Sequence, residues 1–217
     1  MDMGSHMFDQ LIGLFGLPRQ VFARCDTLAQ DYEVEDSSAV VMTLDNGALV
    51  SADIGWNSRT WRHEIEVIGT EGKVLWFPAD TGTVVVTIGR DIEERELPNA
   101  DNLHVPLVED FVNAVAEGHD PVCPVSEAAR TNQLLDAIYQ SADEGRMIEL
   151  PASWLDECES FAIESGRFTG KTCAPWDSKY QGLLREALVE TIGPKVKGHE
   201  ALAGVYFTIS SMTNGAE

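Results

Sequence analysis

Close to the amino terminus, residues that can accept and donate protons recur at helical spacing. Asp2, His6 and Asp9 are separated by four and then three positions, so a helix would project all three side chains from one side. A carboxylate beside an imidazole favours its protonated form and orients the ring. Such a pair takes a proton from a hydroxyl within hydrogen-bonding reach. The spacing makes Asp2 and His6 a candidate pair for handling the proton of a substrate hydroxyl, and Asp9 a candidate for contacting the substrate.

The apolar residues around these positions predict the helix that carries them. Phe8, Leu11, Ile12 and Phe15 follow the i, i+3, i+4, i+7 pattern of one buried face. The following Gly16 and Pro18 predict the end of this helix. Asp2, His6 and Asp9 would then lie on the side opposite the buried face.

Residues 20–97 change to the two-residue period of strands, rich in Val, Ile, Thr and Trp. Asp45-Asn46-Gly47 tolerates positive φ and predicts a hairpin. Two further antiparallel pairs are expected within residues 64–77 and 83–97.

A helical period returns twice after the strands. One apolar stripe, Val108 to Val115, ends before Gly118, and another, Leu134 to Ala142, ends before Gly145. Ser126 is expected to cap the second of these helices. Strands gathered in one block between helices predict an α+β fold, in which an open, mostly antiparallel sheet has helices packed on one face.

The other face of such a sheet would be open to a partner. Trp56, Trp61 and Trp76 are available to cover it, and an open, partly apolar face predicts a homo-oligomer formed through the sheet. The alternative is that these tryptophans pack in the core.

Composition and charge narrow the classes of partner. The 217 residues carry 36 acidic and 15 basic side chains, a formal net charge of −21, which opposes binding to nucleic acid or anionic lipid. No apolar run is long enough to cross a membrane, and no export signal is evident, so a cytoplasmic location is expected. The four cysteines are widely spaced and predict neither a zinc site nor a disulfide framework.

The order of these motifs resembles the second domain of the glucose–fructose oxidoreductase, inositol dehydrogenase and MocA family (Gfo/Idh/MocA). The resemblance runs from Asp2 to Leu150. It rests on the following segments in order: Asp2-Met3-Gly4-Ser5-His6-Met7-Phe8-Asp9 with Gly16, the Asn46-Gly47 hairpin, Val67-Ile68-Gly69-Thr70-Glu71-Gly72, the Phe111 helix with Gly118, Pro121 to Ser126, and Leu135 to Gly145.

This resemblance implies a domain that binds a sugar or polyol substrate, often pairs subunits, and works beside a dinucleotide-binding domain that uses NAD or NADP. It implies that Asp2 and His6 position a substrate hydroxyl and handle its proton. Apart from the resemblance, Arg59 and His63 are expected to contact the substrate.

The parts of such an enzyme that hold the cofactor are missing from the sequence. No G-x-G-x-x-G motif occurs, and the family's lysine in a Glu-Lys-Pro context is absent. We therefore expect no cofactor and no metal to bind this chain alone, and we expect the fragment to be inactive by itself.

Three alternatives remain open from the sequence. The chain could be a non-catalytic module for dimerisation or ligand binding, or a metal-dependent hydrolase built on Asp2, His6 and Asp9. The segment Met3-Gly4-Ser5-His6-Met7 also matches a scar left by tag removal.

Two segments are expected in the chain. Residues 1–150 form the substrate-binding and oligomerisation domain, and residues 151–217 form an unassigned tail with one helix over 177–192, which Asp177 would cap.

Overall fold

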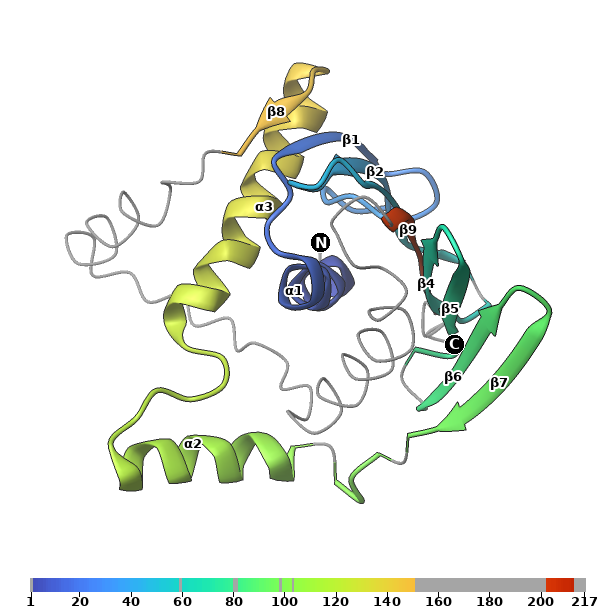
Figure 1. Ribbon diagram of the computed structural model, residues 1–217. Helices are drawn as coiled ribbons and strands as arrows, with labels where there is room; N and C mark the ends of the chain where they lie inside the picture. The colour runs from blue at the N-terminus through green and yellow to red at the C-terminus, as the bar shows by residue number, and fades with distance from the viewer. Residues whose placement is uncertain are drawn as a thin grey trace.

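The central feature of the computed structural model is one sheet of nine strands. The structure describes residues 2–58, 60–79, 82–97, 99–102, 104–150 and 202–212. The strands run in the spatial order β7-β6-β5-β4-β9-β3-β2-β1-β8 (Figure 1). Their bounds are β1 Gln20–Asp26, β2 Ser37–Thr43, β3 Leu49–Ser58, β4 Arg62–Gly69, β5 Gly72–Trp76, β6 Thr83–Ile88, β7 Asp91–Glu96, β8 Ile148–Glu149 and β9 Leu202–Met212.

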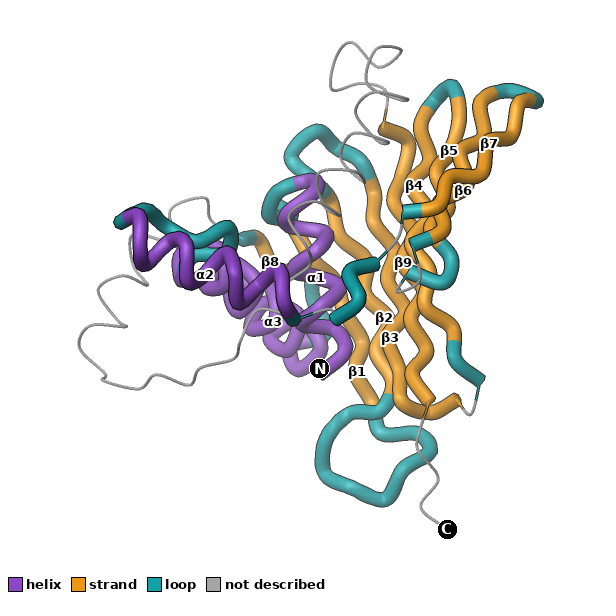
Figure 2. The backbone as a smooth tube through the Cα atoms, turned by 90° about the horizontal axis from the view of Figure 1, so that it is seen from below, coloured by secondary structure: helices purple, strands orange, loops and turns teal. Residues whose placement is uncertain are grey.

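The described helices lie on one side of this sheet. They are α1 (Asp2–Phe15), α2 (Val105–Glu117) and α3 (Val125–Glu144). Figure 2 shows them beside one face, while no described helix covers the other face. This arrangement confirms the predicted α+β class with an open, mostly antiparallel sheet. No helix within the described residues is long and apolar enough to cross a membrane.

The predicted turns occur at the predicted residues. β2 and β3 pair as a hairpin in which Val41 faces Ser51, and Gly47 at its turn has a φ of 87°, a conformation that glycine adopts without steric cost. Strands β4 to β7 form the predicted antiparallel succession. Gly16, with a φ of 83°, follows the last turn of α1, and its backbone N–H donates to the carbonyl of Ile12.

One strand of the sheet comes from the tail. β9 lies between β3 and β4, parallel to the first and antiparallel to the second. It joins the two antiparallel groups of strands, β1–β3 and β4–β7, into a continuous sheet. The sequence shows the apolar stretch 202–209 but gives no indication of its pairing partners. The predicted helix over 177–192 lies outside the described residues.

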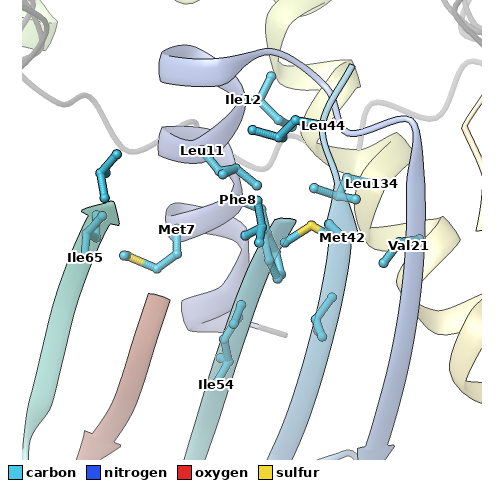
Figure 3. Packing of buried hydrophobic residues seen from close by; sticks show 14 of the residues in the cluster. Met7, Phe8, Leu11, Ile12, Val21, Met42, Leu44, Ile54, Ile65 and Leu134 are labelled. Atoms are coloured by element: carbon cyan, nitrogen blue, oxygen red, sulfur yellow. The ribbon is translucent and has the colours of Figure 1, made fainter. Parts of the chain in front are cut away.

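The core lies between the helices and the sheet. In Figure 3, Met7, Phe8 and Leu11 of α1 point toward the strands, where Met42 and Ile54 meet them. Trp76 belongs to the same cluster and is only 2% exposed. The prediction that Trp76 covers the open face is therefore wrong, because its place in β5 directs the indole to the helix side. Trp56 is partly buried and Trp61 is exposed.

The helices differ from prediction in two respects. α3 begins after Pro124, which occupies the N-cap position without a side-chain cap bond, so Ser126 is not the cap. α2 ends at the left-handed Gly118, as predicted. However, its apolar stripe, Val108, Phe111, Val112 and Val115, is exposed instead of buried.

Candidate functional site

Helix α1 holds the predicted proton-handling residues, and its packing fixes the side from which they project. Phe8 and Leu11 are fully buried against the sheet. Helical geometry places His6 two residues, and so roughly half a turn, from Phe8, on the side away from the strands. His6 is partly buried there. Asp2 is the first residue of α1, one turn before His6.

Asp9 is directed toward α3. Its Oδ1 accepts a hydrogen bond of 2.8 Å from the Thr131 hydroxyl. Burial raises the pKa of the Asp9 carboxyl, and the Thr131 bond and the charge of His6 act against that shift, while Glu127 adds to it. Arg130 pairs with Glu127 at 3.0 Å on the same helix. The carboxylate therefore joins α1 to α3, and its interaction with His6 is electrostatic.

His63 lies beneath α1. It is buried in β4, with Nε2 3.0 Å from Sδ of Met7, and the Trp61 ring meets it edge-on with centroids 5.9 Å apart. His63 therefore contacts the sheet side of α1 through Met7, and His6 does not project from that side. Arg59 lies outside the described residues. The structure thus brings Asp9 close to His6 and does not bring His63 to the same side.

Gln10 was not predicted from the sequence to be a site residue. It lies one turn after His6 on α1 and is buried. Neither its amide nitrogen nor its amide oxygen has a hydrogen-bond partner within the described structure. Its only signal in the sequence is a polar side chain inside the apolar segment from Met7 to Phe15.

The described residues offer no ready metal site. No group of three or more His, Cys, Asp or Glu side chains among them could hold an ion. The hydrolase alternative therefore gains no support from the described part of the chain.

The amino-terminal part of the chain matches a known domain family. Residues 1–75 match the family model of the GFO/IDH/MocA C-terminal domain. The predicted resemblance to the second domain of this family is thereby confirmed. The sequence matches no curated protein.

Solved structures of oxidoreductases share the fold. The aldose–aldose oxidoreductase from Caulobacter crescentus, complexed with glycerol, is 22% identical with a TM-score of 0.60, over 68% of this chain and 46% of that one. The WlbA dehydrogenase from Bordetella pertussis, in complex with NADH and UDP-GlcNAcA, is 26% identical with a TM-score of 0.53, over 69% and 44%. Levoglucosan dehydrogenase in complex with NADH is 20% identical with a TM-score of 0.61, over 69% and 49%. The chain therefore spans about half the length of these proteins.

Proposed function

We propose that this chain is the substrate-binding part of an NAD(P)-dependent sugar or polyol oxidoreductase. In this proposal Asp2 and His6 hold a substrate hydroxyl and take its proton. The observation that carries the proposal is the orientation of α1, which buries Phe8 and Leu11 against the sheet and, by helical geometry, directs His6 away from the strands. The family match over residues 1–75 supports it.

Within the described residues, the glycines of the first helix do not fit a dinucleotide. A phosphate-binding turn needs glycines between a strand and the start of a helix, whereas Gly13 lies inside α1 and Gly16 follows its last turn. We therefore assign no step through the nicotinamide to these residues. The cofactor would be held by a dinucleotide-binding part, and this chain would not reduce it alone.

Binding of a polyol to the His6 side of α1 tests the proposal directly. We expect myo-inositol to shift the NMR signals of the His6 ring in the full chain and expect His6→Ala to weaken binding by about tenfold, the effect of losing one or two hydrogen bonds. His119→Ala is the matched control, because His119 is exposed beyond the end of α2. Unchanged His6 signals at saturating polyol would contradict the proposal.

A second candidate function is a non-catalytic module that assembles through its sheet. Phe22 of β1 and Val41 of β2 face each other in register, and they are 42% and 48% exposed on the face without helices. An apolar pair at the surface of a sheet favours burial against a partner. Oligomerisation is compatible with either function, so polyol binding at His6 distinguishes the two.

A further inference from the structure

Gln10 is in an energetically unfavourable position in the free chain. Its side chain is 5% exposed, and neither the Nε2 donor nor the Oε1 acceptor finds a partner in the described part of the molecule. A buried amide without hydrogen bonds is destabilising, since it loses its bonds to water and gains none in return. Buried polar groups in proteins are nearly always satisfied, so an exception calls for a specific explanation.

The neighbouring helix α3 provides partners for its buried polar side chains. Thr131 donates to Asp9 at 2.8 Å, and the Ser141 hydroxyl accepts from the backbone N–H of Ala23 at 3.0 Å. Gln133 of α3 is also 5% exposed, and its amide is not among the unpartnered atoms of the described residues. The buried polar side chains of α3 are thus engaged, whereas the Gln10 amide of α1 has no partner among the described residues.

Gln10 shares one side of α1 with His6. The two residues are four apart, which places their Cβ atoms roughly 6 Å from each other on the same helix surface. Asp9, between them in sequence, turns toward α3 and is engaged by Thr131. An imidazole and an unsatisfied amide thus lie one turn apart on the side of α1 that faces away from the strands.

We propose that Gln10 is a substrate-binding residue that recognises a hydroxyl adjacent to the one that His6 holds. This inference rests on the proposed function of His6. A primary amide offers a donor and an acceptor in one plane, which matches neighbouring hydroxyls of a polyol, each able to donate and accept. Because neither amide group has a partner among the described residues, binding such a diol would supply the hydrogen bonds that these residues do not provide.

Replacement of Gln10 with methionine tests the inference, because Met has a similar length and no strong hydrogen-bonding group. Thermal unfolding of the full chain is measured first, with Gln133→Met as the matched control. Gln10→Met should raise Tm by about 2–6 °C, since it removes an unsatisfied buried amide. Gln133→Met should lower Tm, since it removes a satisfied one. A lower Tm for Gln10→Met would show that Gln10 has a structural partner and would overturn the inference.

Ligand recognition is measured by NMR with myo-inositol and, as a probe with a single hydroxyl, cyclohexanol. We expect myo-inositol to shift the side-chain amide signals of Gln10 together with the His6 ring, and expect Gln10→Met to weaken its binding by about tenfold. Cyclohexanol should bind wild type and variant equally. Shifts at His6 with none at Gln10, or equal myo-inositol affinity in the variant, would overturn this inference and leave the role of His6 standing. No shift at either residue would overturn both.

Discussion

The carboxylates of Asp9 and Asp36 lie in opposite electrostatic environments. Burial raises the pKa of Asp9. The backbone N–H of Leu28, together with those of Ala29 and Gln30 and the Ser37 hydroxyl, holds the pKa of the Asp36 carboxyl well below its usual value against the effect of burial. These donors lie 2.7–2.9 Å from the Asp36 oxygens. Ionisation of Asp36 should therefore stabilise the folded chain, whereas ionisation of Asp9 should destabilise it.

Asp36→Asn should destabilise the chain at neutral pH. An amide has one acceptor oxygen where the carboxylate has two, so at least one of the three backbone N–H groups of residues 28–30 loses its partner. A lowered folded-state pKa gives stability that is present above about pH 4 and lost as the pH falls below it. Urea midpoints at pH 7 and pH 3 should therefore show a deficit that shrinks in acid. Asp31→Asn, in the same loop and exposed, is the control, and a deficit that does not depend on pH would contradict the account.

Asp9→Asn and Thr131→Val should change the stability of the chain in opposite directions at neutral pH. A raised folded-state pKa means that the charged Asp9 carboxylate is a cost, which is present above that pKa and relieved as the pH falls toward about 4. Asp9→Asn removes this cost and can still accept from Thr131, so its urea midpoint should be at least that of wild type at pH 7. Thr131→Val leaves the carboxylate without its donor and should cost about 1–3 kcal/mol. A lower midpoint for Asp9→Asn than for Thr131→Val would contradict this reading of the α1–α3 contact.

At the scale of elements, the side chain of Ser141 connects α3 to the sheet by a hydrogen bond. Its hydroxyl accepts from the N–H of Ala23 in β1 at 3.0 Å and donates to the carbonyl of Arg146 at 2.6 Å, and the side chain is fully buried. Ser141→Ala should cost about 1–3 kcal/mol of unfolding free energy, because it leaves a buried N–H and carbonyl without this partner. Ser126→Ala, exposed in the first turn of α3, should change stability little. A larger loss for Ser126→Ala in urea titrations would restore Ser126 as the helix cap.

Local sequence patterns predicted the helices and strands better than they predicted which strands pair and which faces are buried. Apolar periods and glycines located α1, α2 and the β2–β3 hairpin, because these depend on residues close in sequence. The insertion of β9 between β3 and β4 depends on pairing across more than 130 residues, which periodicity does not encode. The exposure of the α2 stripe has the same cause, since an amphipathic period indicates a face that can be buried but not what buries it.

In the candidate site, too, the contacts between residues distant in sequence could not be predicted. The spacing of Asp2, His6 and Asp9 placed them on one helix, but it did not reveal that Asp9 is held by Thr131, a residue 122 positions away. His63 was expected to contact the substrate, whereas it packs against Met7 of α1, a contact between residues 56 positions apart in the sequence. Gln10 was missed because its unsatisfied amide is visible only once burial and partners are known.

At the scale of the whole molecule, the open sheet face should mediate self-association. Phe22 and Val41 are exposed neighbours on the face without helices, so a charge there would oppose burial against a second copy. We expect the wild-type chain to sediment as a dimer or larger and Val41→Lys to shift it toward monomer. Val34→Lys, in the exposed β1–β2 loop, is the control and should leave the association unchanged. A wild-type monomer that Val41→Lys does not alter would contradict this interface.

The most direct test of the proposed oxidoreductase function is polyol-dependent reduction of NAD or NADP by the protein expressed from the complete reading frame that contains this chain. We expect reduction with a sugar or polyol, a loss of about 10²–10⁴-fold in kcat for His6→Ala, the usual contribution of a general base, and little change for His119→Ala. A complete protein that reduces neither cofactor with any polyol, or an active one that His6→Ala leaves unaffected, would contradict it.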